Sequence, residues 1–387
     1  MKKGWKAKTL EEACQFSNGL WKGEKPPFVK VGVIRNTNFT KDGTLDDSDI
    51  AYLDVEAKKL EKRRLQFGDI ILEKSGGGPK QPVGRVALFD KEDGDFSFSN
   101  FTAALRVLDP DDLDFRFVHK FLHWTYVSGV TEGMQSNSTG IRNLDGDAYK
   151  AIEISFPPLA EQQRIVGLLD EAFEGVATAK ANAEKNLQNA RALFESHLQS
   201  VFTQRGPGWV EKPLGELCDI LDNQRKPITK RDRVAGDIPY YGATCIQDYV
   251  KDFIFDEPLV LVGEDGAKWK SGDKTAFAVS GKCWVNNHAH VLRPHRDKTT
   301  DYWLISFLSH SDLTPFVSGL TVPKLNQGNL REIPIPLPPI SIQRQLAETA
   351  ESLEEETQRL ARLYERKHAA LEALKKSLLH QAFSGGL

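Results

Sequence analysis

The most regular feature of the sequence is a stripe of apolar residues through residues 161–202. Apolar side chains recur there about every 3.6 residues, the period of an α-helix with one apolar face. Pro157-Pro158 precedes the stripe and Gly206-Pro207-Gly208 follows it, and these residues start and stop helices. The pattern predicts one helix of about 42 residues, roughly 60 Å long.

A second stripe, through residues 342–383, has the same period. A helix of this length extends beyond any single small domain, so we expect the two stripes to bury each other in an antiparallel coiled coil with pseudo-twofold symmetry. The alternative is that each helix lies alone on its own domain. The expected helix–helix packing positions are Ile165, Leu169, Val176, Leu187, Phe194, Leu198, Leu346, Leu353, Leu360, Tyr364, Leu371 and Leu379.

The sequence contains an internal repeat. A shift of 181 residues places Pro157-Pro158 on Pro338-Pro339 and then, without a gap, Gln162 on Gln343. Near the start of each copy, Gly4-Trp5 recurs as Gly208-Trp209 at a shift of 204. The second copy has therefore lost 23 residues before its helix, whereas the helix has kept its length. A helix of fixed length attached to a variable domain is typical of a spacer.

The segments before each helix show the pattern of mixed α/β domains. Short apolar or β-branched runs bounded by Gly, Asp and Pro predict strands at 28–34, 69–73 and 103–108, and again at 258–263 and 290–293. Helical patches follow at 115–124 and 301–308. The expected fold class is two mixed α/β domains joined by two long antiparallel helices. The expected boundaries are 1–156 and 206–336 for the globular domains, and 157–205 and 337–387 for the helices.

Composition and charge limit the classes of function. The 51 basic and 54 acidic side chains give a net charge of −3, so binding to nucleic acid requires local segregation of the basic residues. The four cysteines form no C-x-x-C pair, which disfavours a zinc ribbon and a disulfide framework and predicts packed thiols. The sequence has no apolar run of membrane-spanning length and begins with polar residues. We expect a cytoplasmic protein without a membrane partner.

No catalytic or metal motif stands out. The phosphate-binding pattern G-x-x-x-x-G-K-[ST] is absent, and Gly76-Gly77-Gly78 is followed by prolines and not by a helix. The pairs His119/His123 and His288/His290 have no carboxylate or thiol at metal-ligand spacing in the sequence, so we expect packed or surface histidines and no metal. The segment 155–158 lacks the Asn or Asp that an amino-methyltransferase loop requires. The sequence predicts a protein that is not an enzyme.

Basic loops are the candidate DNA contacts. Glycine-marked loops beside lysines follow two predicted strands, where amides and ammonium groups could meet a duplex backbone, and Arg, Asn and Gln can read base edges. Turn chemistry and solvated surface charge explain the same residues without DNA. The candidates are Arg35, Asn36, Asn38, Lys74, Lys80, Gln224, Arg225, Lys226, Lys230, Arg231, Arg233, Lys268, Lys270 and Lys274.

Two variable globular parts, each closed by Ile-x-Ile-x-Phe/Leu-Pro-Pro-Leu/Ile-x-x-Gln and a long helix, resemble the specificity subunit of type I restriction-modification enzymes. Residues 156–165 fit the central conserved region of that family, and the distal copy departs from it at Ile342, where Glu is usual. The resemblance covers nearly the whole chain. It implies a bipartite site in double-stranded DNA, with one half-site for each target-recognition domain and the helices as a spacer.

The resemblance also implies partner subunits. Two methyltransferase subunits would dock on the helices and bring S-adenosylmethionine, and restriction subunits that use ATP and Mg²⁺ could join them. The specificity subunit itself is non-catalytic and holds no cofactor. Two other interpretations stay open on the residues alone. One is a scaffold that joins two protein-binding domains through a coiled coil without DNA, and the other is a methyltransferase, which the missing motifs disfavour.

Overall fold

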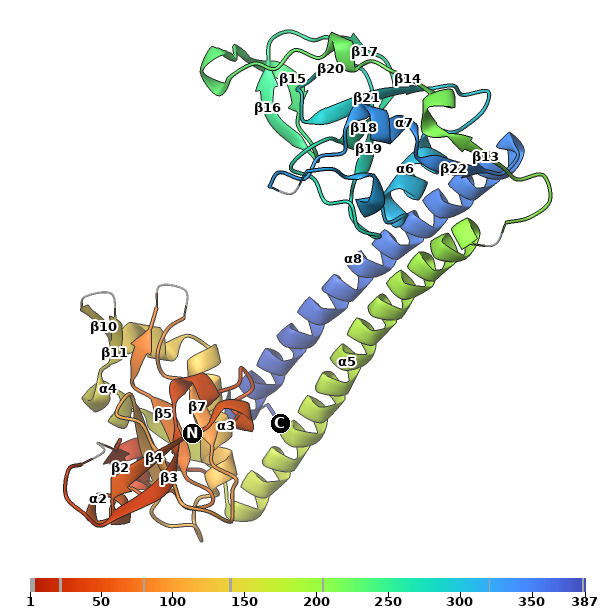
Figure 1. Cartoon of the computed structure of the whole chain (residues 1–387). Coiled ribbons are helices and arrows are strands. Elements are labelled where there is room, and N and C mark those ends of the chain that lie inside the picture. Colours follow the sequence, from red (N-terminus) through yellow and green to blue (C-terminus); the bar gives the residue numbers. More distant parts are fainter. Residues whose placement is uncertain are drawn as a thin grey trace. The chain divides into compact units, whose positions relative to one another are not determined.

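The computed structural model describes residues 4–20, 23–78, 81–138, 141–203, 205–319, 321–384 and 386–387. The chain forms two compact units (Figure 1). The first unit contains residues 1–183 and 365–387, and the second contains residues 184–364. Each unit therefore combines one globular part with half of each long helix. This division cuts through both helices and does not separate them from the globular parts.

The first unit is built around an antiparallel sheet with the strand order β2-β9-β5-β7. Its strands are β2 (Cys14–Asn18), β9 (Thr102–Val107), β5 (Ile70–Glu73) and β7 (Val86–Leu88). The sequence predicted β5 and β9 within one residue at each end. Helix α3 (Phe115–Val127) covers one face, and Leu10, Ile70, Leu105 and Phe117 are completely buried in the core between them.

Smaller elements of the first unit surround this sheet. A second sheet has the order β4-β3-β8, in which β3 and β8 are parallel, and a third has the order β10-β11-β6. The strand β1 pairs with β12 just before the long helix. The bounds are β1 (Lys6–Thr9), α1 (Leu10–Ala13), β3 (Phe28–Ile34), β4 (Ala51–Glu56), α2 (Ala57–Glu61), β6 (Ser75–Gly77), β8 (Phe96–Phe98), β10 (Gln135–Ser138), β11 (Ile141–Leu144), α4 (Gly146–Lys150) and β12 (Glu153–Phe156).

The second unit repeats this plan. Its central sheet has the order β14-β21-β18-β19, its second sheet has the order β16-β15-β20-β17 with β15 and β20 parallel, and β13 pairs with β22 before the helix. The bounds are β13 (Val210–Pro213), β14 (Cys218–Ile220), β15 (Ala235–Tyr241), β16 (Ile246–Val250), β17 (Phe255–Asp256), β18 (Leu259–Gly263), β19 (Ala276–Val279), β20 (Lys282–Val285), β21 (Ala289–Pro294), α6 (Asp301–His310), α7 (Gln327–Arg331) and β22 (Pro334–Leu337). The internal repeat predicted from the sequence is therefore present in the fold.

The two globular parts differ most in one connection of the second sheet. Residues 35–50 join β3 to β4, whereas residues 242–245 join the equivalent strands β15 and β16. The longer connection contains two short 3-10 helices, Asn36–Asn38 and Asp47–Asp49. About half of the 23 residues that the second copy lacks are therefore missing at one loop, and the strands that carry the loop are kept.

Each copy ends in a helix of 45 residues, α5 (Leu159–Thr203) and α8 (Ile340–Ser384). In the first unit the two helices are antiparallel, because Ile165 on α5 shares a core with Leu379 on α8 whereas Lys180, further along α5, pairs with Glu372, earlier on α8. The predicted packing positions Ile165, Leu169, Val176 and Leu379 are buried. Half-buried are Leu187, Leu346, Leu353, Leu360, Tyr364 and Leu371. The side chains of Phe194 and Leu198 lie outside the described residues.

The sequence predicts that the two apolar stripes bury each other. In the structure they also pack on the globular parts. In the first unit, Phe383 near the end of α8 packs edge-on against Phe117 and Phe121 of α3, with ring centroids 5.2 and 5.5 Å apart. In the second unit, Leu346 packs on the core that contains Trp303. In each unit, part of a long helix therefore also packs on the globular part. The short helix α3 or α6 provides the contact surface, because it has an apolar face to bury.

Two further expectations are tested by burial and hydropathy. Cys14, Cys218 and Cys283 are buried thiols as expected, and burial raises the pKa of Cys14 to about 12, but Cys245 is exposed at the turn between β15 and β16. The packed environment expected for all four cysteines is therefore wrong for Cys245, because this turn is too short to cover it. Within the described residues, none of the helices combines the length and apolar character needed to cross a bilayer.

Candidate nucleic-acid interface

The first unit contains a cleft of about 650 Å³ lined by Gly76, Gly77 and Gly78, and the first two belong to β6 and not to the loop that the sequence predicts. Two predicted residues, Arg35 and Asn36, line it together with Arg85 and Phe101. Glu73, 2% exposed, accepts hydrogen bonds from Arg85 Nε at 2.7 Å and Nη2 at 3.0 Å, and Asn36 Nδ2 donates to Glu73 Oε1 at 3.1 Å. Arg85 therefore neutralises the carboxylate of Glu73 in the cleft, and the hydrogen bond to Glu73 holds the side chain of Asn36 in place.

The other candidates of the first unit have different surroundings. Arg35 Nη2 donates to Asp49 Oδ2 at 2.9 Å, and Lys74 Nζ donates to Asn18 Oδ1 at 2.9 Å. Asn38 is 1% exposed, and its amide donates to the backbone carbonyls of Asp46 and Asp49. Asn38 is thus not positioned to meet a base edge, because its side chain holds the long loop together. Lys80 lies outside the described residues.

Most basic candidates of the second unit lie at the surface. Lys230 and Arg231 belong to the 3-10 helix Lys230–Asp232, and the side chain of Arg231 is 91% exposed. A second group follows β18 in the loop that carries Lys268. The exposed candidates are Gln224, Lys226, Lys230, Arg231, Lys268, Lys270 and Lys274. Exposed lysines and arginines on loops can form phosphate contacts without restricting the sequence that is bound.

Arg225 and Arg233 depart from the exposed basic loop that the sequence predicts. The side chain of Arg225 is 13% exposed, and its Nη1 donates to Glu264 Oε2 at 2.5 Å and to the carbonyl of Ala289 at 2.8 Å. Arg233 lies over the ring of Tyr240 at 4.2 Å and pairs with Asp248 at 3.0 Å. The expectation of exposure is wrong for both side chains, because each neutralises a carboxylate contributed by another strand or loop.

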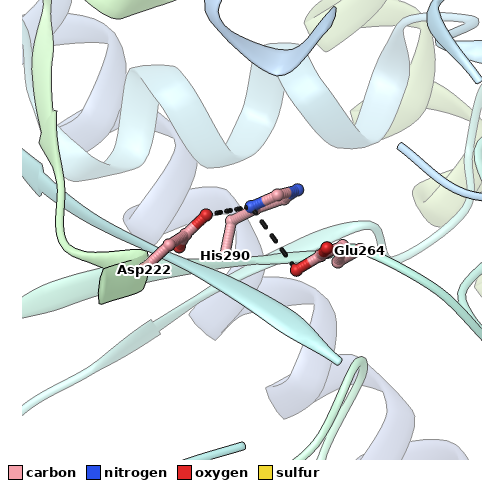
Figure 2. Close-up of side chains that lie close together, drawn as sticks. All are labelled: Asp222, Glu264 and His290. Carbon is pink, nitrogen blue, oxygen red and sulfur yellow. Dashed lines mark hydrogen bonds and ion pairs between the residues drawn. The ribbon is translucent and has the colours of Figure 1, made fainter. Parts of the chain in front are cut away.

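Arg225 pairs with Asp222 and Glu264, and these two carboxylates form a cluster with His290. Figure 2 shows Asp222, Glu264 and His290. His290 is completely buried on β21, with Nδ1 2.6 Å from Asp222 Oδ2 and Nε2 2.7 Å from the carbonyl of Leu325. Both ring nitrogens face oxygen atoms, so the imidazole is held on both sides. Burial tends to raise the pKa of Asp222, but the hydrogen bond and charge of His290 outweigh it and the pKa is lowered.

The same cluster could hold a metal ion by geometry. One ligating atom from each of Asp222, Glu264 and His290 lies within 4.8 Å of the others. The carboxylates are already neutralised, however, because Arg225 pairs with Glu264 and Lys324 Nζ lies 2.8 Å from Glu264 Oε1. This chemistry favours an internal ion-pair network. These carboxylates could not be recognised from the spacing around His290, because Asp222 and Glu264 follow other strands, β14 and β18.

The other predicted histidines are also accounted for. His119 and His123 lie one turn apart on α3 and are both buried. Burial lowers the pKa of His119 to about 3 and that of His123 to about 4, so both rings are neutral at physiological pH. His288 is exposed and pairs with Asp265. The expectation that these histidines are packed or at the surface is confirmed.

Comparison with known proteins connects this geometry to a family. The family described as the type I restriction modification DNA specificity domain matches residues 2–187 and 207–365. A putative type I restriction enzyme specificity subunit of Haemophilus influenzae, S.HindORF215P, is 39% identical over 167 residues, which are 43% of this chain and 41% of that protein. The chain thus matches about two fifths of the length of that relative.

Two further similarities extend over nearly the whole chain. The putative MjaX specificity subunit of Methanocaldococcus jannaschii is 19% identical over 98% of this chain and 93% of its own length. The crystal structure of the HsdS subunit from Thermoanaerobacter tengcongensis has a TM-score of 0.66 at 20% identity and covers 100% of this chain and 98% of that one. At this identity the structural similarity concerns the fold, which the two proteins share from end to end.

Proposed function

The chain belongs to the family of type I restriction-modification DNA specificity subunits, and from this membership we propose that it binds a DNA site made of two separated half-sites. Each globular part reads one half-site, and the long helices set the distance between them. The observation that carries this proposal is the repetition of one fold, with the same central-sheet strand order twice and a helix of 45 residues after each copy. A repeated reader joined to a spacer of fixed length fits a bipartite target.

The basic surface supports contacts to the DNA backbone in the second half-site. Lys226, Lys230 and Arg231 lie on one exposed loop, and Lys268, Lys270 and Lys274 lie on another. Neither loop depends on these side chains for its fold, in contrast to Arg225. In the first half-site, the cleft that contains Asn36 offers polar groups held in fixed positions, as reading of base edges requires.

We also propose that the chain is the non-catalytic member of a larger assembly. Methyltransferase subunits that carry S-adenosylmethionine would dock on it, and restriction subunits that use ATP and Mg²⁺ could join. The cofactors then belong to those partners. The net charge of −3 is consistent with partners that supply part of the positive surface around the DNA. The assembly would work in the cytoplasm, where the DNA it acts on is accessible.

Selection from random duplex DNA tests the proposal. The full chain, together with a type I methyltransferase subunit, is mixed with the DNA pool, and the bound molecules are sequenced. Two short conserved blocks separated by a constant gap are expected. Retention of unrelated sequences, or of no DNA, would contradict the proposal and favour a scaffold that joins proteins. A chain with Lys268→Met and Lys270→Met should select the same blocks with lower affinity, because phosphate contacts carry no sequence information.

A further inference from the structure

The first unit contains a small pocket that is separate from the cleft at Asn36. It has a volume of about 230 Å³ and lies between the central sheet and α4. Its polar and charged lining comes from Ser17 and Asn18 on β2, Lys74 after β5, and Tyr149 and Lys150 on α4, and Ala103 forms part of the wall. Two of these side chains are cationic, and no carboxylate is among the lining residues that the structure describes.

Lys74 lacks a compensating acid. Its ammonium group is half-buried and donates to the amide oxygen Asn18 Oδ1 at 2.9 Å. Burial alone lowers the pKa of Lys74. Within the described part of the chain, no carboxylate pairs with Lys74. A partly desolvated cation whose only partner is a neutral amide is stabilised when an anion reaches it.

The remaining polar groups of the pocket are also incompletely used. Tyr149 is 1% exposed, and its hydroxyl has no hydrogen-bond partner among the described residues. Lys150 is half-buried, and its Nζ lies 3.5 Å from the exposed carboxylate of Asp147. Buried polar groups are nearly always paired in folded proteins, so the unpaired hydroxyl of Tyr149 in this wall favours a ligand site.

In the second copy of the fold, the position equivalent to this pocket is occupied by the cluster of Asp222, Glu264 and His290. Ala103 pairs with Leu72 in the central sheet, and at the equivalent register His290 pairs with Val262. The shift of 204 residues places Asp222 at the position of Asn18, and the same register places Glu264 at the position of Lys74. The second unit thus fills the site with an imidazole and two acids. The first unit leaves it open and lined by two lysines.

We propose that the pocket formed by Asn18, Lys74 and Lys150 binds a phosphate-type oxyanion. The two ammonium groups supply the charge, and the amide of Asn18 supplies a neutral polar group. The small volume suits one tetrahedral anion and excludes a nucleotide base with its sugar. The oxyanion could be a phosphodiester of bound DNA or a free small anion, and both present the same chemistry to the lysines.

Thermal unfolding of the full chain in inorganic phosphate provides the first test, with sodium chloride at matched ionic strength as the reference. The melting temperature should rise in a saturable way with phosphate. The variant Lys74→Met should lose this rise, and so should Ala103→His, which fills the pocket as His290 does in the second copy. The matched control Lys376→Met, which changes an exposed lysine on α8 in the same unit, should keep the rise.

Salt-dependent DNA binding provides the second test and identifies the source of the anion. This arm rests on the proposed function, whereas the phosphate arm does not. If the ligand is a DNA phosphate, Lys74→Met reduces the slope of log affinity against log salt by about one. A phosphate effect with an unchanged slope identifies a free anion. The proposal is overturned if phosphate has no saturable effect and the slope is also unchanged, or if the phosphate effect persists in both pocket variants.

Discussion

Gln162 and Gln343 hold the same position in the two copies and make the same hydrogen bonds. Both side chains are completely buried. Gln162 accepts from the backbone N–H of Asp114 at 2.9 Å and donates to the carbonyl of Pro157 at 2.8 Å. Gln343 accepts from the backbone N–H of Thr300 at 3.0 Å and donates to the carbonyl of Pro338 at 3.0 Å. Each glutamine therefore links the first turn of a long helix to the start of α3 or α6 by hydrogen bonds.

Replacing either glutamine should destabilise its own unit. In Gln162→Leu and Gln343→Leu, the buried backbone groups lose their partners, and each change should cost about 2 kcal/mol of unfolding free energy. Urea unfolding monitored by far-ultraviolet circular dichroism measures the effect. The exposed neighbour change Gln163→Ala should leave the midpoint nearly unchanged. Equal midpoints for Gln162→Leu and Gln163→Ala would show that the hydrogen bonds of Gln162 do not contribute to stability.

Acid should weaken the first unit through His119 and His123. Burial, together with nearby positive charges, lowers their pKa values to about 3 and about 4, whereas in the unfolded chain both titrate near 6.5. Between these values the unfolded state binds more protons, so stability is complete above about pH 6.5 and falls as the pH decreases, by at most about 1.4 kcal/mol per pH unit for each histidine. Urea unfolding at pH 7.5 and pH 5.5 measures this loss.

The matched variants separate these histidines from other acid-sensitive groups. His119→Met and His123→Met keep a side chain of similar size without a titrating ring, and each should reduce the difference in stability between the two pH values. His368→Met changes an exposed histidine on α8 and should leave the difference unchanged. A pH dependence that is the same in all three variants would assign the acid sensitivity to other residues.

Arg225 should stabilise the second unit and not bind DNA directly. Arg225→Met leaves Glu264 in the interior with less compensation and should cost about 3 kcal/mol of unfolding free energy. The variant Arg231→Met removes a side chain that is 91% exposed and should change stability by less than about 0.5 kcal/mol. The DNA affinity of Arg231→Met should fall and its salt dependence should weaken. Wild-type stability in Arg225→Met would exclude the structural role.

Longer helices should change the spacing of the DNA site. Ala183 and Tyr364 are the last residues before the boundary between the units on α5 and α8, and they are equivalent in the repeat. Inserting seven residues after each adds about 10 Å of helix and nearly preserves the phase of the apolar stripes. We expect an altered gap, or loss of binding to the original site, with both half-site sequences unchanged. Altered half-sites at the original gap would contradict the spacer role.

The periodic parts of this fold could be predicted from the sequence because local pattern determines them. The stripe through 161–202 corresponds to α5, and the strand predicted at 28–34 coincides with β3. The repeat could be recognised because Gln162 and Gln343 make buried contacts that tolerate little change. In these segments, the residues that shape the backbone are also those that face the core.

The candidate site was harder to predict because its side chains depend on partners distant in the sequence. Arg225 was expected on an exposed basic loop, but its side chain bonds to Glu264 and to the carbonyl of Ala289, which are 39 and 64 residues away in the sequence. Asn38 has the composition of a base-reading residue and is instead occupied by the carbonyls of its own loop. Charge and hydrogen-bond capacity can be listed from a sequence, but their pairing requires the tertiary fold.

The end of α8 has a consequence for the order in which the protein is completed during synthesis. Leu379 and Ala382 are buried in the core of the first unit, and Phe383 packs against the same core. A nascent chain that has produced all of residues 1–183 still lacks these side chains and exposes part of that core. The core of the unit translated first is thus completed only after the second unit and the end of α8 have been synthesised, and a chain truncated near residue 375 would leave that core incomplete.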